Sequence, residues 1–342
     1  MMSAKKDLIL PVQKLMMRAN HHFTKDDFNR NRLFFGLLEQ AGLQIHSFEE
    51  WKKHIMKIDT NKGMFVVKGY KEKDDLDTMI SVINLLQKSG SVNLSMYHPF
   101  YDQQYILQVD HLYWTLSQYL PPKRIFSFVK QEDRVDGLRL LEDFHFQAKN
   151  IFSQTNLSIP KEKMMSKWKH RLIQFEDNLP LLEKWFNPTT ISEIVYYSHV
   201  SLEKLEPVCT KTEDTILHGD VASHNFIRST DNKVYLIDYD LLSSGCEEWD
   251  LVQYASRILP FIKWNSEKFF QTFQRYSEIR NHLWFWKALS FPMDILREGN
   301  QFANESQENK MVMPKSFASF TFFLSTWSLR KQFLTNQNNL IQ

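Results

Sequence analysis

The pattern of hydrophobic and polar positions changes its period once along the chain. Up to about residue 120, short alternating runs predict strands: "HIMKIDT" and "MFVVKGY" flank the turn "NKG" as a hairpin, and "QQYILQVDHLYWTLSQYL" predicts two more strands. Two helices accompany them, one over about 24–42 and one over about 74–89, and each ends near a glycine. The first 120 residues therefore predict a small α+β unit.

After about residue 120 the apolar positions recur at helical spacing. Within "DRVDGLRLLEDFHFQAKNI" one stripe includes Leu138, Leu141 and His145, so we expect a core histidine there. "EKMMSKWKHRLIQFEDNL" predicts a basic amphipathic helix, whose charged face we expect to be solvated rather than to bind an anion. The polar segment "EGNQFANESQENK" and the tail "TNQNNLIQ" are expected to be mobile. The pattern predicts two domains, 1–120 and 121–342.

One stretch of strand-like residues interrupts the helical part. It reads "ILHGDVASHNFIRSTDNKVYLIDYD" and carries several polar groups between short apolar runs. The runs "TIL" and "KVYLID" suit strands, so His218 and Asp220 follow one strand, while Asp238 and Asp240 follow another. Carboxylates that follow strands in this way project into a cleft. We therefore expect a polar site built from the ends of these two strands.

The spacing of these polar groups suits phosphoryl transfer from ATP. That reaction uses an aspartate to orient a hydroxyl group and accept its proton, and an asparagine and an aspartate to hold Mg²⁺. Asp220, Asn225 and Asp238 supply this set. Asp220 and Asn225 stand five positions apart, as the corresponding Asp and Asn do in the protein-kinase catalytic loop.

Composition and charge narrow the class of protein. The 342 residues are 43% hydrophobic, enough for a sizeable core in two lobes or one large mixed domain. The 42 basic and 40 acidic side chains give a formal charge of only +2, which does not favour nucleic acid or an anionic membrane as a partner. Cys209 and Cys246 form no metal or redox spacing, and no run is long enough to span a bilayer. We expect a cytoplasmic protein.

The two motifs together resemble a known family. "HGDVASHN" followed by "LIDYD" is similar to the signature of the aminoglycoside phosphotransferase and choline kinase superfamily. Within it, "LHGDVASHNF" and "VYLIDYD" resemble the spore-coat-associated branch of Bacillus-type bacteria, the CotS/YutH-like proteins. The resemblance implies a two-lobed, protein-kinase-like α+β fold, with a small N-terminal lobe that holds an antiparallel sheet and a larger, mainly helical C-terminal lobe.

The resemblance also implies a role for individual residues. Asp220 would be the catalytic base, and Asn225 and Asp238 would hold Mg²⁺. Lys68 in "FVVKGY" would reach the α- and β-phosphates of ATP, and Asp250 in "EEWDL" would brace the catalytic loop from the start of the next helix.

The chain departs from the kinase pattern in its N-terminal part. The turn before Lys68, near "SFEEWKKH", contains no glycine that would let the backbone approach phosphates, and it carries two acids. The helix "DDLDTMISVINLLQ" has no acid at its middle, so the partner of Lys68 is either missing or is Asp77. Asp240 stands where kinases have a glycine, and it either joins the metal site or only replaces that glycine.

Some of these residues have simpler explanations. Lys68 suits an exposed lysine of an edge strand, which opposes aggregation, as well as it suits a phosphate ligand. His218 and His224 could ligate a metal, but a structural hydrogen bond for His218 and plain exposure for His224 explain them better. A dinuclear hydrolase site is a third reading. It is disfavoured because no two histidines stand at i, i+4 and the acids follow the kinase order.

Two functions remain open on the sequence. The first is a Mg²⁺- and ATP-dependent phosphotransferase that acts on a hydroxyl group of a small molecule or a cell-envelope component. The second is a pseudokinase that serves as a structural or assembly protein of the spore coat. In either case the resemblance implies synthesis in the mother-cell cytoplasm, spore coat proteins as partners, and deposition in the coat.

Overall fold

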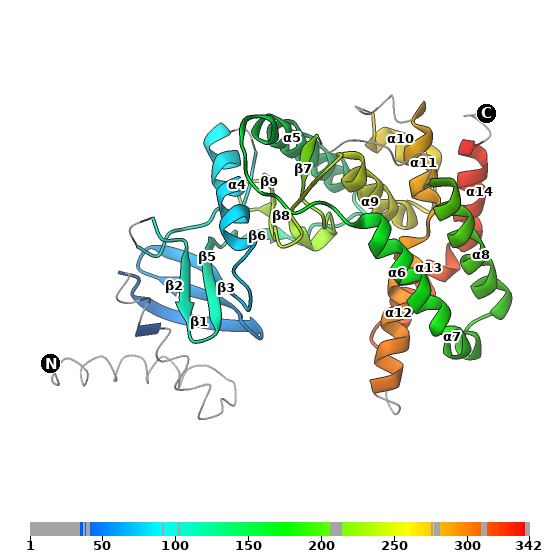
Figure 1. Cartoon of the computed structure of the whole chain (residues 1–342), viewed down its shortest axis with the longest axis horizontal. Helices are drawn as coiled ribbons and strands as arrows, with labels where there is room; N and C mark the ends of the chain where they lie inside the picture. The colour runs from blue at the N-terminus through cyan, green and yellow to red at the C-terminus, as the bar shows by residue number, and fades with distance from the viewer. Residues whose placement is uncertain are drawn as a thin grey trace. The chain divides into compact units, whose positions relative to one another are not determined.

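The structure is a computed structural model, which describes residues 35–36, 38, 42–90, 92–101, 103–205, 214–274, 276, 281–308 and 313–338. The chain divides into two compact units (Figure 1). Unit 1 comprises Met1–Arg124 and Ile227–Ile237, and unit 2 comprises Ile125–Phe226 and Asp238–Gln342. Of the helix expected over about 24–42, Phe35, Gly36 and Leu38 have a described helical backbone and Gly42 lies in a turn with a φ of 75°, while the other residues lie outside the described residues.

Unit 1 contains a five-stranded antiparallel sheet in the order β1-β2-β3-β5-β4. Its strands are β1 (Ile45–Lys52), β2 (Ile55–Thr60), β3 (Gly63–Tyr70), β4 (Ile106–Val109) and β5 (Leu112–Gln118). The hairpin predicted around "NKG" is confirmed, because β2 and β3 pair from Ile55 opposite Lys68 to Thr60 opposite Gly63. The two strands predicted in "QQYILQVDHLYWTLSQYL" are β4 and β5.

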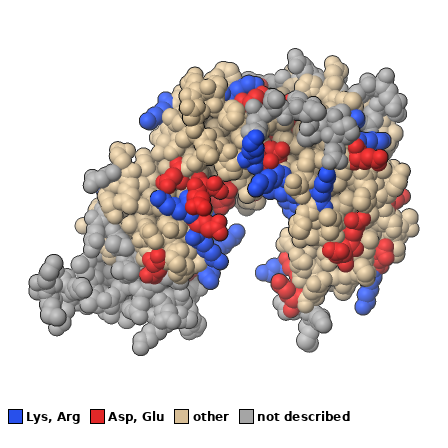
Figure 2. Space-filling view, in the orientation of Figure 1, with Lys and Arg blue, Asp and Glu red and all other residues tan. Residues whose placement is uncertain are grey.

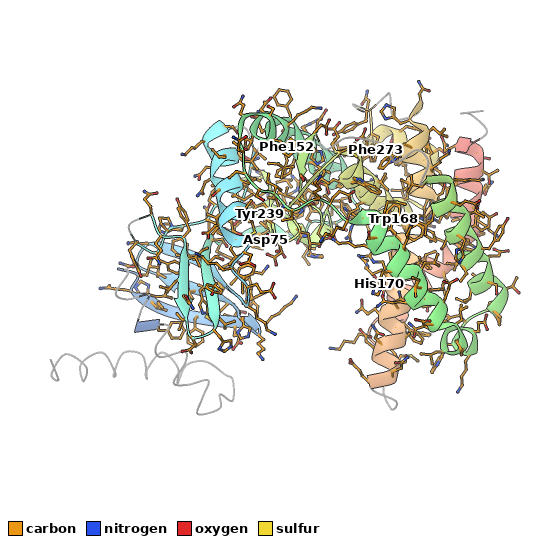
Figure 3. All side chains as sticks on the ribbon, in the orientation of Figure 1. Asp75, Phe152, Trp168, His170, Tyr239 and Phe273 are labelled. Carbon is orange, nitrogen blue, oxygen red and sulfur yellow. The ribbon has the colours of Figure 1, made fainter. Side chains whose placement is uncertain are left out.

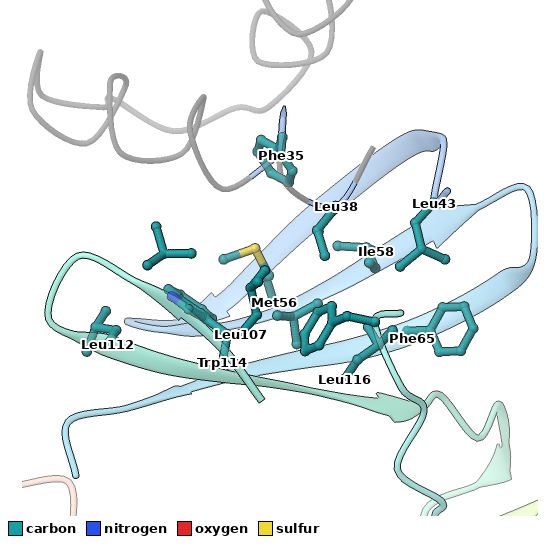
Figure 4. Close-up of a cluster of buried hydrophobic side chains, with 13 residues drawn as sticks. Phe35, Leu38, Leu43, Met56, Ile58, Phe65, Leu107, Leu112, Trp114 and Leu116 are labelled. Carbon is teal, nitrogen blue, oxygen red and sulfur yellow. The ribbon is translucent and has the colours of Figure 1, made fainter. Parts of the chain in front are cut away.

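One face of this sheet carries the core of unit 1 (Figure 4). Alternate residues of β2 and β3 point to it, because successive side chains of a strand face opposite sides. Each large apolar side chain that is fully buried contributes roughly 1.5–3 kcal/mol relative to exposure. The core residues are Phe35, Leu38, Leu43, Met56, Ile58, Phe65, Val67, Phe100, Leu107, Val109, Leu112, Trp114 and Leu116.

A helix and a small second sheet complete the described part of unit 1. Helix α4 (Leu76–Ser89) ends at Gly90, whose φ of 71° is the left-handed conformation that a glycine C-cap supplies. Strands β6 (Pro122–Arg124), β8 (Phe226–Ser229) and β9 (Val234–Leu236) form a three-stranded sheet in the order β6-β8-β9. The chain thus returns to unit 1 after residue 226 to add β8 and β9.

Unit 2 is mainly helical, with ten α-helices among its described residues. These are α5 (Gln131–Gln154), α6 (Met164–Asp177), α7 (Leu179–Trp185), α8 (Pro188–Leu205), α9 (Glu248–Ile258), α10 (Ser266–Thr272), α11 (Leu283–Ser290), α12 (Met293–Glu308), α13 (Phe317–Ser325) and α14 (Trp327–Asn338). Strands β7 (Thr215–Leu217) and β10 (Ser243–Gly245) form a two-stranded antiparallel sheet. The α+β fold class, with an antiparallel sheet in the N-terminal part and a mainly helical C-terminal part, is confirmed.

Aromatic side chains make much of the core of unit 2. Trp168 of α6, labelled in Figure 3, stacks on Phe291 with ring centroids 4.7 Å apart and meets Trp249 of α9 edge-on at 5.4 Å. Offset and edge-to-face pairs of this kind add about 0.5–1.5 kcal/mol beyond the area they bury. These aromatic side chains therefore serve packing in unit 2.

The prediction that "EGNQFANESQENK" is mobile was wrong for most of that segment. Residues 298–308 lie in α12, and Glu298, Gly299 and Asn300 are buried. The polar side chains are satisfied by distant partners: Glu298 accepts from Ser319 Oγ at 2.5 Å, and Asn300 Nδ2 donates to the Arg171 carbonyl at 2.9 Å. In the tail, residues 335–338 belong to α14, and residues 339–342 lie outside the described residues.

No described helix combines the length and the hydrophobicity that crossing a membrane would require.

Candidate active site

The segment after β7 makes a turn that only glycine can make. Gly219 has a φ of +80°, and a Cβ atom added there would lie 2.2 Å from the carbonyl oxygen of Leu241. Both the backbone conformation and the contact therefore exclude a side chain. His218, just before this glycine, is buried, and its Nδ1 accepts from the Asp220 backbone N–H at 3.3 Å. The turn thus orients Asp220 relative to β7.

Asp250 holds the same turn from the first turn of α9. Its carboxylate accepts the backbone N–H of His218 at 2.8 Å and that of Gly219 at 3.0 Å. It also accepts from Nε2 of His145 on α5 at 2.9 Å, and neither side chain is exposed. Burial raises the pKa of Asp250, but the hydrogen bonds and charges of the two histidines outweigh it, so the pKa lies below its ordinary value.

Asn225 is fixed against Asp220. It ends a short 3₁₀ helix, Ser223–Asn225, and its side chain is only 1% exposed. Nδ2 donates to the Asp220 carbonyl at 2.8 Å and to Asp220 Oδ2 at 3.2 Å. Because Nδ2 makes these bonds, Oδ1 is the acceptor that the amide presents, and no described residue donates to it. His224, beside it, is 72% exposed, with Nε2 3.9 Å from Asp220 Oδ2.

Asp238 follows β9 in an unusual backbone conformation. Its φ of +64° is in the left-handed region, which non-glycine residues adopt rarely and at a cost of about 1–2 kcal/mol. Such conformations persist where the surroundings impose them, and they cluster at functional sites. Asp238 and Asp240 are exposed, whereas Tyr239 between them is buried with its ring edge-on to His218 at 5.7 Å.

Sequence reasoning missed Arg257, which contacts Asp220 directly. Its Nη2 donates to Asp220 Oδ1 at 2.6 Å. Arg257 lies seven residues after Asp250, and thus two turns along the same face of α9, which is a spacing that could have indicated it. Burial and the neighbouring charge of Arg297 lower the pKa of Arg257 to about 10, although Asp220 opposes this shift. Arg257 remains a cation at neutral pH.

Lys68 lies on β3 of unit 1, whereas Asp220, Asn225 and Asp238 lie in unit 2. Its explanation as an edge-strand lysine was wrong, because β3 pairs with β2 on one side and β5 on the other. The side chain is half-buried, and Nζ lies 5.3 Å from the centroid of the Tyr70 ring. Asp77, the acid considered as its partner, pairs with Lys73 at 3.2 Å.

The turn that would face phosphates is narrow and contains no glycine. β1 ends at Lys52 and β2 begins at Ile55, so Lys53 and His54 form the turn, with a φ of +66° at His54. The two acids of this region, Glu49 and Glu50, belong to β1, where Glu49 stands opposite Lys57.

Comparison with solved structures identifies the fold of this chain. No protein-family model and no curated protein sequence matches the chain. Among solved structures, an aminoglycoside phosphotransferase from Alicyclobacillus acidocaldarius matches with a TM-score of 0.67 at 13% identity, over 96% of this chain and 99% of the other. Spectinomycin phosphotransferase, in complex with ADP and spectinomycin, gives 0.63 at 16% identity over 90% and 98%. This chain has their kinase-like fold.

A third solved structure with this fold is a choline kinase from Streptococcus pneumoniae. It matches with a TM-score of 0.52 at 13% identity, over 90% of this chain and 99% of the other. The structural neighbours therefore include aminoglycoside phosphotransferases and a choline kinase, which agrees with the broader resemblance seen in the motifs. None of these comparisons concerns the spore coat.

The kinase-like fold implies a nucleotide and a metal, and the residues of unit 2 suit the metal. Mg²⁺ prefers oxygen ligands, and Asn225 Oδ1 and the Asp238 carboxylate are such ligands. The hydrogen bonds from Nδ2 to Asp220 present Oδ1 as the remaining group of the Asn225 amide. Within the described residues, no three His, Cys, Asp or Glu side chains cluster as a metal site.

Proposed function

We propose that this chain is a Mg²⁺- and ATP-dependent phosphotransferase that acts on a hydroxyl group of a small molecule or a cell-envelope component. The observation that carries the proposal is the pair of hydrogen bonds from Asn225 to Asp220, on a turn that Asp250 holds through two backbone amides. This arrangement fixes a base and a candidate metal ligand relative to each other, which is what phosphoryl transfer requires most.

Each residue then has a role. Asp220 accepts the proton of the acceptor hydroxyl, whose oxygen bonds to the γ-phosphorus as the bond from that phosphorus to ADP breaks. Asn225 and Asp238 would hold Mg²⁺, which would supply positive charge to offset that of the phosphates. Asp240 supports this metal site. Lys68 binds the α- and β-phosphates from unit 1. His218 and Asp250 act as positioning residues, since they orient the turn that carries Asp220.

The first test is calorimetric titration of ATP into the purified chain, with and without Mg²⁺. We expect binding that requires Mg²⁺ and that Asp238→Asn weakens at least about tenfold, because the variant removes the charge of one metal ligand. Asp110→Asn is a matched control, since Asp110 also has a left-handed backbone, with a φ of 54°, in the β4–β5 turn. Asn tolerates this conformation at both positions.

The second test separates catalysis from binding. Release of ADP is measured with a panel of hydroxyl compounds, and Asp220→Asn is expected to abolish turnover while ATP binding remains. If the folded protein binds no ATP at any Mg²⁺ concentration, the phosphotransferase proposal is wrong.

One set of observations favours the second candidate, a pseudokinase of the spore coat. The Lys53–His54 turn lacks glycine, and Asp77 pairs with Lys73. Under this proposal the kinase-like fold is a scaffold for coat proteins, and the chain is made in the mother cell and deposited in the coat, as the motif resemblance implies. Immunodetection in coat extracts of wild-type and Asp220→Asn spores tests it, because a scaffold is deposited equally in both.

A further inference from the structure

A cavity within unit 2 lies directly beside Asp220. Its volume is about 570 Å³, which is in the range of small-molecule sites, and its walls come from the turn after β7 and from α6, α9, α12 and α13. Four cationic side chains line it: Lys167, Arg171, Arg257 and Arg297. In the orientation of Figure 1, Lys and Arg side chains gather on the visible face of unit 2 near the beginning of α6 (Figure 2).

The three acidic side chains that line this cavity each form an ion pair with an arginine. Asp220 pairs with Arg257 at 2.6 Å, and Glu298 pairs with Arg297 at 2.8 Å. The third acid, Asp294, accepts from Arg330 at 2.6 Å, and this partner comes from α14, outside the lining. These pairs leave the lining with an excess of positive charge.

The cations of the cavity lining that have no paired acid in the described part of the chain lie on one face of α6. Lys167 and Arg171 are four residues apart, so their side chains lie on the same side of the helix. Neither forms an ion pair with any described residue. Burial is the main cause that lowers the pKa of Arg171, and the nearby charge of Arg297 lowers it further, while Asp220 opposes both.

Three other residues of the wall have a buried polar atom without a hydrogen-bond partner in the described structure. These atoms are Nε2 of Gln253, Oγ of Ser256 and Oδ2 of Asp294. All three residues are at least nine-tenths buried, at 7%, 1% and 5% exposure. Buried groups without partners are rare, but each of these atoms has almost no accessible surface, so they make this wall polar without reaching into the cavity.

We propose that the acceptor of the phosphoryl group is an alcohol that also carries a phosphate or carboxylate group, and that Arg171 and Lys167 bind this anion while the hydroxyl lies against Asp220. This rests on the proposed function and adds the substrate class. Arginine binds such groups through two parallel hydrogen bonds, and a bound anion would offset the charge that the crowded cations now share. The sequence predicted that the basic face of α6 is only solvated. Under this proposal, part of that face binds an anion instead.

The test measures binding without ATP or Mg²⁺, so that it is independent of phosphoryl transfer. Glycerol 3-phosphate, glycerate, glycerol and ethanolamine are titrated calorimetrically into the full chain. We expect glycerol 3-phosphate or glycerate to bind at least tenfold more tightly than glycerol and ethanolamine. The stronger of the two identifies the anion as phosphate or carboxylate.

Variants on α6 locate the site. Arg171→Gln should weaken binding of the anionic alcohol at least tenfold, and Arg171→Lys should restore part of it. Lys169→Gln is the control, because Lys169 is exposed on the same helix and does not line the cavity. Thermal melts verify that each variant is folded.

Three outcomes of the titrations with alcohols would overturn the proposal. These are tighter binding of ethanolamine than of both anions, no binding of either anion at millimolar concentration, and anion binding that Arg171→Gln leaves unchanged. If Arg171→Gln instead abolishes ATP binding, the cavity serves the nucleotide and the proposal is wrong. If the anion binds as expected but ATP does not bind, this site stands and the phosphotransferase proposal fails.

Discussion

His145 on α5 donates a hydrogen bond across 2.9 Å to the carboxylate of Asp250 on α9, and neither side chain is exposed to solvent. The two residues are 105 positions apart in the sequence, so the bond ties the first helix of unit 2 to the helix that holds the Asp220 turn. Since Asp250 also accepts two backbone N–H groups of that turn, its loss would leave three donors, two of them buried, without this partner.

We therefore expect Asp250→Ala to lower the free energy of unfolding by about 3–5 kcal/mol, the usual cost of removing one partner of a buried charged pair. Asp214→Ala is the control, because Asp214 pairs with Lys149 at 2.7 Å with side chains 42% and 59% exposed. That exposed pair should be worth at most about 1 kcal/mol. Urea unfolding followed by tryptophan fluorescence measures both variants, and similar losses would contradict the assignment.

Ionisation of Asp250 should contribute to how the stability of the protein depends on pH. Its pKa in the folded protein lies below the ordinary value of 3.8, so folding favours the ionised form. The stability that this preference contributes is fully present above the ordinary pKa and is lost as the pH falls through the folded pKa. The stability difference between wild type and Asp250→Asn should therefore shrink below about pH 4. If this stability difference instead grows as the pH falls, the pKa of Asp250 is raised by folding and the prediction is wrong.

Replacing Gly219 should cost far more than replacing another left-handed glycine. In Gly219→Ala the new Cβ meets the Leu241 carbonyl, so we expect a loss of more than about 2 kcal/mol and displacement of Asp220. Gly90 has a φ of 71° but open space around it, so Gly90→Ala should cost only about 1–2 kcal/mol. Thermal unfolding measures the loss of stability in both variants. Gly219→Ala combines the clash with Leu241 and the strained backbone, whereas Gly90→Ala has only the strained backbone. Equal losses would therefore exclude the clash as the cause.

Arg257 should act on turnover rather than on nucleotide binding. Its guanidinium holds Asp220 Oδ1 at 2.6 Å, and a misplaced base lowers the rate of the chemical step. If the proposed function is correct, Arg257→Gln should reduce kcat by about tenfold to a hundredfold with little change in KM for ATP. Arg257→Lys should recover part of the loss. Arg139→Gln, at a half-exposed position on α5, is the control. An increase in KM alone would place Arg257 at the nucleotide.

The elements that the sequence predicted well are those with local causes. Alternation on both sides of "NKG" is sufficient to specify the β2–β3 hairpin, and helical spacing is sufficient to locate α5 and α6. The strand ends before His218 and Asp238 also follow from short apolar runs. Such patterns depend on neighbours in the chain, which a single sequence contains in full.

The features that the sequence did not predict depend on distant partners. Arg257 reaches Asp220 across 37 positions, and Asn300 reaches the Arg171 carbonyl across 129. The polar part of α12 resembled a mobile segment because nothing near it in the sequence indicates that its polar groups are satisfied. Likewise, the central position of Lys68 depends on β5, which pairs with β3 only after the intervening α4 and β4.

The division of the chain has a mechanical consequence for the candidate metal ligands. The backbone passes between the two units at three junctions, after Arg124, after Phe226 and after Ile237. The second junction begins one residue after Asn225, and the third lies immediately before Asp238. Both candidate ligands therefore lie in unit 2 and are joined through the segment Ile227–Ile237, which is folded into unit 1. A substitution that unfolds strand β8 or β9 would loosen the backbone connection between Asn225 and Asp238 without altering either residue.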